Sequence, residues 1–182
     1  MTALRRRNGA PLRPASVRIR PEQPDDAGII AEITREAFRT DPRSTHKEEF
    51  TIAGLRASGA LTVSLVAEKN GQVIGHIALS PVRVSDGSNG WYALGPVAVA
   101  PPHQQSGTGT ALVTEGLAAL DRLGAAGCVV LGEPAFYGRF GFKKRRTLRL
   151  PGVPPEYFLA RSFSNDFPVG TVSYHPAFDA TS

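Results

Sequence analysis

The sequence predicts an α+β fold in which a mixed, mostly antiparallel sheet of six to seven strands is flanked by helices. One observation is a series of consecutive strands, at 61–68, 73–84 and 91–99. The Asn70-Gly71 pair between the first two strands is a strong signal for a tight hairpin. The other observation is that the third strand leads through a glycine-bearing loop into a helix at 107–123 and then a buried strand at 128–131. Strands joined by such a crossover helix pair in parallel.

The N-terminal part is predicted to hold one strand and two helices. Residues 17–20 alternate between apolar and basic side chains, as a short strand does. Asp25 or Asp26 can cap a helix that runs to about residue 39, because acids suit the first turn of a helix. A second helix covers about 46–57 and ends at Gly59, a residue type favoured just after a helix.

The C-terminal part has weaker periodicity. A short segment at 135–140 is followed by a predicted strand at 143–150. Residues 151–168 contain several prolines, which cannot donate to a sheet ladder. We expect a long surface connection there, with a short helical piece near 156–160. Residues 169–174 predict a last strand.

Length and composition are those of one ordinary domain. The chain has 182 residues, of which 41% are hydrophobic and 20% are charged, and can bury a sizeable core. We therefore expect a single domain at 17–178. Cys128 is the only cysteine, which excludes an intrachain disulfide framework and favours a reducing, cytoplasmic location. No apolar run reaches the length of a membrane span, and no apolar stretch follows Arg5-Arg6-Arg7 as in a secretory signal.

The net charge of +5 is concentrated in two stretches. Residues 1–20 hold six arginines and no acid, and residues 139–149 hold six lysines and arginines and no acid. The first stretch could touch nucleic acid, but it carries neither stacking aromatics nor a known nucleic-acid motif. We predict that 1–16 is a disordered basic tail and that nucleic acid is not a partner.

The loop at 104–110 carries the clearest signal for ligand binding. It joins a strand to a helix, and the free N–H groups in the first turn of such a helix form a site for phosphate. Gly107 and Gly109 remove the Cβ atoms that would hold an anion away from the backbone. The structural alternative is a plain strand–helix turn in which the glycines serve only geometry.

Two common phosphate-binding motifs fit this loop poorly. A Walker loop ends in Gly-Lys-Ser or Gly-Lys-Thr, and no lysine lies between Lys69 and Lys143. A Rossmann fingerprint needs a third glycine where Leu112 stands, although Glu133 lies about 20 residues on, where that fold has its ribose-binding acid. The order of elements also opposes a Rossmann sheet, in which the glycine loop follows the first strand.

A different family matches the loop together with a second motif. The first motif is Gln104-x-x-Gly107-x-Gly109, and the second is Tyr137-x-x-x-Gly141-Phe142, about 30 residues further on. In this order the two motifs resemble those of the GNAT N-acetyltransferases, and the sequence around Tyr137 is similar to that of their YhbS-like branch. The resemblance covers about 17–178. It departs from the family pattern mildly, at Gln105 and Glu133.

The resemblance implies a GNAT-like fold, a co-substrate and its binding residues. The sheet of that fold is splayed at its centre, here between 94–99 and 128–131, and the thioester of acetyl-CoA lies in the gap. The strand residues that would pair with the pantetheine arm are Val97, Ala98 and Val99. The loop residues that would hold the pyrophosphate are Gln104, Gln105, Ser106, Gly107, Thr108, Gly109 and Thr110. The family pattern implies no metal.

The implied chemistry needs a proton donor for the departing thiolate and a neutral amine. Tyr137 is the candidate donor, because phenol and thiol pKa values are close enough for proton transfer; its structural alternative is a core aromatic residue. Glu133 is the candidate base, with a helix cap as the structural alternative. His76 is the next candidate, and a water chain or an already neutral amine would need no base.

The acceptor is predicted only as a class: an amine on a small molecule, a peptide or a protein. Residues 22–50 contain more acids than bases, which would attract a cationic amine unless these are simply solvated helix faces. We expect a monomer or a homodimer. Two other functions stay open: a catalytically silent acyl-CoA-binding module of the same fold, and a nucleotide-binding regulator that uses the arginine-rich tail on nucleic acid.

Overall fold

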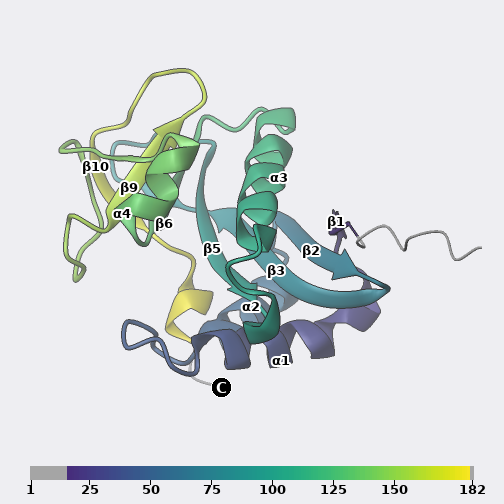
Figure 1. Ribbon diagram of the computed structural model, residues 1–182. Coiled ribbons are helices and arrows are strands. Elements are labelled where there is room, and N and C mark those ends of the chain that lie inside the picture. The colour runs from purple at the N-terminus through teal and green to yellow at the C-terminus, as the bar shows by residue number, and fades with distance from the viewer. Residues whose placement is uncertain (1–15, 181–182) are drawn as a thin grey trace, which may run out of the picture.

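The computed structural model describes residues 16–180 and shows a seven-stranded mixed sheet with helices on both faces (Figure 1). The strand order is β1-β2-β3-β5-β6-β9-β7. In the order of the chain, these strands are β1 (Arg18–Pro21), β2 (Val63–Lys69), β3 (Gln72–Pro81), β5 (Trp91–Val99), β6 (Gly127–Leu131), β7 (Lys143–Lys144) and β9 (Phe158–Ser162).

A smaller three-stranded sheet has the order β4-β10-β8. Its strands are β4 (Arg83–Val84), β8 (Leu148–Arg149) and β10 (Gly170–Ser173). The α-helices are α1 (Ala27–Phe38), α2 (Glu48–Ala57), α3 (Thr108–Arg122) and α4 (Pro134–Tyr137). Single 3₁₀ turns are η1 (Pro24–Asp26), η2 (Pro101–His103), η3 (Gly138–Phe140) and η4 (Pro176–Asp179). The predicted basic tail at 1–16 lies almost entirely outside the described residues.

The N-terminal half follows the prediction closely, except that the strand expected at 73–84 is divided: β3 ends at Pro81, and β4 pairs with β10 in the smaller sheet. The hairpin between β2 and β3 turns at Asn70 and Gly71, which both have positive φ, as the tight two-residue turn requires. Of the two candidate caps for the first helix, Asp26 is the one that bonds to the turn before it. Its carboxylate accepts a hydrogen bond from the N–H of Gln23 at 2.8 Å. The predicted parallel pairing of β5 with β6 is confirmed.

The C-terminal half corrects the prediction in two places. The helical piece expected near 156–160 is wrong, because β9 pairs antiparallel with β6 inside the main sheet. Phe158 and Leu159 pack into different core clusters, so both faces of β9 are covered and its sequence shows an apolar run without strand alternation. The strand expected at 143–150 is split, since β7 pairs with β9 while β8 pairs with β10.

The helices cover opposite faces of the main sheet. α3 buries Leu112, Val113 and Leu120 against one face, and the remaining face carries α1 and α2, whose Ile30 and Ile52 pack on β2 and β3 (Figure 1). Cys128 is completely buried in the α3-side core, as predicted for a small apolar residue. Each helix therefore has one apolar face, which explains the periodicity read from the sequence.

The sheet opens beside the middle strand. β5 pairs with β6 only from Trp91 to Ala93, and beyond that point the two strands separate. On its other side, β5 carries a register shift against β3 at Gly95-Pro96, whose peptide bond is cis. The predicted splay at the centre of the sheet is thus present, and it leaves one edge of β5 without a strand partner.

No helix between residues 16 and 180 combines the length and the apolar character needed to cross a membrane.

Candidate functional site

The loop between β5 and α3 presents a row of unpaired backbone donors. Within residues 16–180, no N–H group from Gln105 to Thr110 donates a hydrogen bond, and the first such bond at this helix start runs from Ala111 to Gly107. N–H groups in the first turn of a helix carry partial positive charge. The row is therefore suited to hold phosphate oxygens.

Internal bonds hold this loop in shape. The side-chain amide of Gln104 donates to the carbonyl of Val99 at 3.0 Å, and the Ser106 hydroxyl donates to the carbonyl of His103. Gly107 has φ of 86°, in the left-handed region that glycine adopts without strain, directly before α3. The N–H groups are thus held in position before any ligand arrives, which lowers the cost of ordering the site on binding.

Two residues on the free edge of β5 direct their backbone N–H and C=O groups toward the gap. The N–H of Ala100 donates to the carbonyl of Ile74 on β3. Because peptide groups alternate in direction along a strand, Ala98 also faces β3, whereas Val97 and Val99 face the opened side. Of the three strand residues predicted to bind a cofactor, Val97 and Val99 offer backbone hydrogen bonds to it, and the side chain of Ala98 is buried.

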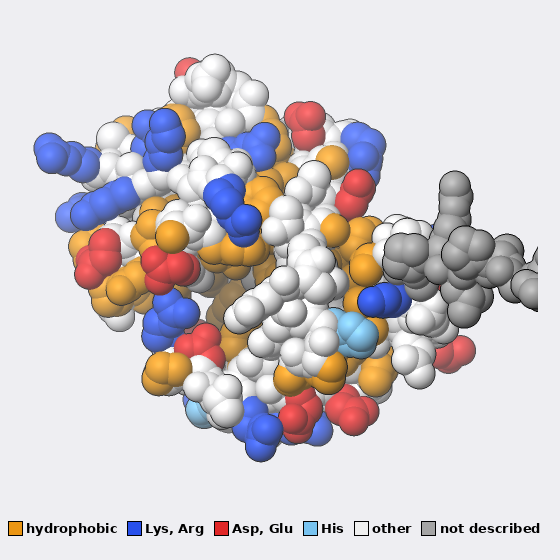
Figure 2. Space-filling model, viewed as in Figure 1, with side chains coloured by type: hydrophobic (Ala, Val, Ile, Leu, Met, Phe, Trp, Pro, Cys, Tyr) orange, Lys and Arg blue, Asp and Glu red, His pale blue; other side chains and the backbone are white. Residues whose placement is uncertain are grey.

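The gap continues to the surface between α3 and the segment that holds α4. Figure 2 shows the surface hollowed beside the start of α3, with apolar side chains in the depth. A Cβ atom added to Gly109 would lie 3.8 Å from Val99 Cγ2 and 3.9 Å from Phe136 Cζ. The glycine loop, β5 and α4 therefore surround one space.

Tyr137 is the last residue of α4 and follows Phe136, which borders this space. Its ring packs against Phe136 and Phe142, with centroid distances of 4.9 Å and 6.0 Å. Gly132 lies so close to the ring that a Cβ atom there would overlap it. Within residues 16–180 the Tyr137 hydroxyl has no hydrogen-bond partner, although it is not among the fully enclosed polar atoms. The ring is fixed and the hydroxyl is available to a ligand.

Burial keeps Tyr137 protonated. Loss of water around the ring raises the pKa of Tyr137 to about 12, with the nearby Cys128 adding to the rise. The same desolvation raises the pKa of the Cys128 thiol. A ligand thiol in this gap would experience the same effect, so phenol and thiol pKa values shift in the same direction.

Glu133 lies at the N-terminal end of α4 but does not cap it. Its carboxylate makes no hydrogen bond to the helix backbone and instead pairs with Arg43 at 3.2 Å. The pair joins the α1–α2 connection to the start of α4, across 90 residues of sequence. Glu133 is about half exposed, so water reaches the carboxylate.

His76 belongs to a buried network that sequence reasoning did not find. Ser64 donates to the Glu22 carboxylate, so the Ser64 oxygen must accept from His76 Nε2, which lies 2.8 Å away. Arg56 also donates to Glu22, at 2.7 Å. Burial lowers the pKa of His76, partly opposed by Glu22. His76 is fully buried and neutral, which disfavours it as a base that contacts an acceptor.

The excess of acids at 22–50 does not form a free negative rim. Most of these carboxylates have a partner: Glu22 with Arg56, Asp26 with Arg20, Glu36 with Arg39, Asp41 with Arg43, Glu49 with Arg35, and Glu48 with the Ser44 hydroxyl. The ordinary structural interpretation of these charges therefore fits better than attraction of a cationic amine.

No group of three or more His, Cys, Asp or Glu side chains within the described residues is arranged to hold a metal ion.

Comparisons with known proteins identify the family of this chain. The model of the Acetyltransferase (GNAT) family matches residues 28–142. The chain is 36% identical to an uncharacterized N-acetyltransferase, YhbS of Escherichia coli K12, over 88% of this chain and 98% of that protein.

Two solved structures are similar over nearly their whole length. A GNAT family acetyltransferase from Brucella melitensis, crystallised with acetyl-CoA, shares 48% identity and a TM-score of 0.81, covering 90% of this chain and 99% of that one. The structure of Escherichia coli YhbS in complex with CoA shares 34% identity and a TM-score of 0.81, covering 97% and 98%. These matches show that the chain belongs to the GNAT acetyltransferase family and is YhbS-like.

Proposed function

We propose that this protein transfers the acetyl group of acetyl-CoA directly to a primary amine in a ternary complex, with Tyr137 as the general acid. The observation that carries the proposal is the row of free N–H groups from Gln105 to Thr110 next to the unpaired edge of β5. Pyrophosphate fits the first feature and the amide-bearing pantetheine arm fits the second. The similar Brucella and Escherichia proteins hold acetyl-CoA and CoA, which supports the same co-substrate here.

The reaction follows from the groups around the gap. The amine nitrogen attacks the thioester carbon and forms the new C–N bond, and the carbonyl oxygen becomes an oxyanion. The N–H of Val97 faces the gap and is the proposed donor to that oxyanion. When the C–S bond breaks, the thiolate takes the proton of the Tyr137 hydroxyl, and the tyrosinate regains a proton from solvent. The acceptor is an amine of a small molecule, a peptide or a protein.

Glu133 is the proposed base, acting on the ammonium form of the acceptor directly or through water. Its carboxylate is solvent-accessible and its only charged partner among the described residues is Arg43. The structural alternative was that Glu133 caps α4, but its carboxylate makes no hydrogen bond to the first turn of that helix. A base is needed because only the neutral amine has the lone pair that attacks the thioester.

Binding of acetyl-CoA should raise the melting temperature. At about 100 times its dissociation constant, the ligand adds roughly 2.7 kcal/mol to the free energy of unfolding, which for a chain of this size is a shift of about 5–10 °C. Differential scanning fluorimetry measures it, with NADH as the comparison ligand. A shift with NADH and none with acetyl-CoA would contradict the proposed co-substrate.

A matched pair of glycine variants locates the binding. Gly109→Leu would project a side chain toward Val99 and Phe136, into the proposed pantetheine path, and should abolish most of the acetyl-CoA shift. Gly28→Leu makes the same change at an exposed position of α1 with open space around it, and should keep the shift. An equal shift in both variants would show that the ligand lies elsewhere.

Replacement of Glu133 should make turnover depend on the free amine. We expect Glu133→Gln to lower kcat/KM at neutral pH by about 100-fold, as for loss of a general base, and the deficit should vanish above the amine pKa. Arg43→Gln, which removes only the partner of the carboxylate, should stay within a few-fold of the wild type. A deficit that is the same at every pH would assign Glu133 a structural role.

A further inference from the structure

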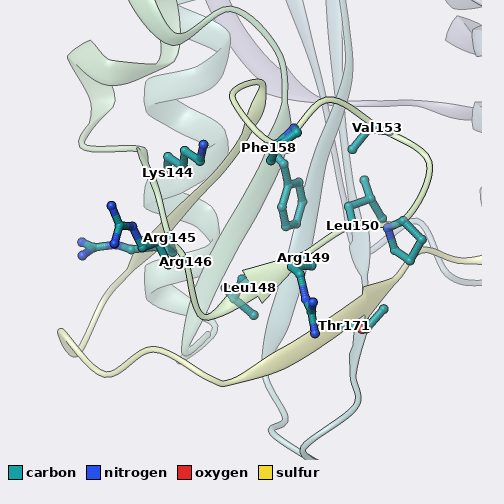
Figure 3. Close-up of a pocket in the computed structure, with 11 residues that line it drawn as sticks. Lys144, Arg145, Arg146, Leu148, Arg149, Leu150, Val153, Phe158 and Thr171 are labelled. Atoms are coloured by element: carbon teal, nitrogen blue, oxygen red, sulfur yellow. The ribbon is translucent and has the colours of Figure 1, made fainter.

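A second pocket lies away from the gap, between the basic segment after α4 and the C-terminal strands (Figure 3). Its volume is about 570 Å³, within the range of small-molecule sites. The wall is formed by residues from 144–155, by Phe158 at the start of β9 and by Thr171 of β10. The site belongs to neither the glycine loop nor the free edge of β5.

The pocket is lined by positive charge without any acid. Four of its lining side chains are cations, Lys144, Arg145, Arg146 and Arg149, and no Asp or Glu lines it. None of these four forms an ion pair with an acid of residues 16–180, whereas most arginines of the α1–α2 region do. Like charges held close together repel one another, and an anion would relieve that repulsion.

Arg145 differs from an ordinary solvated cation. Its guanidinium lies 3.8 Å from the centre of the Phe167 ring, a stacked arrangement that holds the side chain in place. Its Nε is enclosed and has no hydrogen-bond partner among the described residues. A ligand cannot reach this enclosed nitrogen, but the terminal nitrogens of the guanidinium are not enclosed, and a carboxylate or phosphate is the acceptor that they fit best.

The rest of the wall is apolar. Leu148 and Phe158 are almost fully buried and form its floor. Figure 3 places Lys144, Arg145 and Arg146 on one side of the Phe158 ring and Leu150 and Val153 on the other, with Arg149 below the ring. Three of the four cations are thus gathered on one side of the pocket, and Arg149 lies beside its apolar part.

We propose that this pocket binds an organic anion with an apolar body, such as a medium-chain carboxylate or phosphate ester. The charged end would lie at the cations and the chain against Leu150, Val153 and Phe158. The pocket also adjoins the catalytic segment, because Phe158 pairs with Leu131 and the N–H of Gly132 donates to the carbonyl of Tyr157. The ligand is either part of an acceptor that carries the amine or a separate small molecule.

Calorimetric titration with three probes tests the ligand class without requiring acetyl transfer. Octanoate has both charge and chain, acetate has only the charge, and octan-1-ol has only the chain. We expect octanoate to bind at least about tenfold more tightly than either, since each part contributes separately. If octanoate binds no more tightly than acetate or octan-1-ol, the proposal is wrong.

Charge variants locate the binding. The double variant Lys144→Gln/Arg149→Gln removes two exposed cations from the pocket and should weaken the binding of octanoate by about tenfold. Arg18→Gln/Arg122→Gln removes two exposed cations elsewhere, neither of which pairs with an acid within residues 16–180, and should leave the octanoate affinity unchanged. Equal affinities in both variants would overturn the site. Acetyl-CoA affinity should be unaffected in both; if it falls together with octanoate, the pocket is part of the acetyl-CoA site and the proposal fails.

8-Aminooctanoate carries a carboxylate, an apolar chain and a primary amine. It therefore distinguishes an amine acceptor that is anchored in the pocket from a separate anionic ligand. Acetylation of 8-aminooctanoate, with a KM raised by Lys144→Gln/Arg149→Gln, would identify the pocket as the acceptor's anchor. Binding of 8-aminooctanoate without acetylation would identify the anion as a separate ligand. Either result supports an organic-anion site. The acetylation result rests on the proposed acetyl transfer, whereas the binding result is independent of the acetyl-CoA melting experiment.

Discussion

Tyr137→Phe should reduce acetyl transfer by about 100- to 10,000-fold while the acetyl-CoA melting shift stays at its wild-type value. Removing the hydroxyl takes away the proton for the departing thiolate but leaves the ring, which packs against Phe136 and Phe142. Stopped-flow or steady-state release of CoA measures the rate. Because the hydroxyl makes no hydrogen bond to the protein within residues 16–180, no folding contact is lost with it.

Tyr174→Phe is the matched control for this result. The Tyr174 hydroxyl is enclosed and has no hydrogen-bond partner among the described residues, so its removal should leave turnover unchanged and stability equal or slightly higher. If Tyr174→Phe reduced turnover as much as Tyr137→Phe, Tyr137 would not be the acid.

The pH profile gives an independent check on Tyr137. Its raised pKa of about 12 keeps the donor protonated through the alkaline range. Wild-type turnover should therefore show no loss on the alkaline side up to at least about pH 10. A descending limb centred below about pH 10 would show that the proton donor has a lower pKa than this buried phenol.

Glu22→Gln should lower the free energy of unfolding by about 3 kcal/mol at neutral pH, at the lower end of the cost of breaking a buried ion pair because Arg56 is partly exposed. For a chain of this size the melting temperature should fall by about 6–12 °C. The change keeps the shape of the side chain but removes the charge that accepts from Arg56 and Ser64. Thermal denaturation measures it.

The pH dependence of that difference follows from the Glu22 pKa. Burial alone would raise it, but the nearby His76 and the hydrogen bonds from Arg56 and Ser64 outweigh burial and lower it to about 2. A carboxylate with a depressed pKa stabilises the fold above its unfolded value and loses that effect as pH falls toward the folded value. The difference between wild type and Glu22→Gln should therefore be full above about pH 5 and shrink toward pH 2.

Glu36→Gln is the comparison for Glu22→Gln. Glu36 pairs with Arg39 on the surface, with both side chains about half exposed or more, so its loss should change stability by less than about 0.5 kcal/mol. Equal effects of the two substitutions would mean that the buried network around His76 contributes no more than a surface pair.

The features that were predictable from the sequence depend on neighbouring residues. The Asn70-Gly71 turn needs residues that adopt positive φ, and the chain between 91 and 122 alternates, turns at glycine and becomes helical as its sequence indicates. The motif around Tyr137 was likewise readable as an ordered pair with the glycine loop. Local backbone preferences and side-chain periodicity determine these elements, so the elements can be predicted without knowledge of the fold.

β9 was predicted wrongly because its environment is not local. Phe158, Leu159 and Ala160 form an apolar run. Such a run is compatible both with a strand that is covered on both faces and with a short buried helix, so the sequence pattern does not distinguish them. The prolines before it favoured a surface connection. Only the position of β9 between β6 and β7 decides that the run is a central strand.

By itself, the sequence determined the order of the main elements from β1 to α4, the glycine loop between β5 and α3, and the placement of Tyr137 after β6. The tertiary structure alone decided the partners of the charged and polar side chains. Glu133 meets Arg43 across 90 residues and Glu22 meets Ser64 across 42. The cations at 144–149 line a pocket only because β9 and β10 bring Phe158 and Thr171 beside them. Adjacent residues set the backbone conformation of turns and amphipathic helices, whereas the path of the whole chain sets the electrostatic partners and the pairing of a strand such as β9.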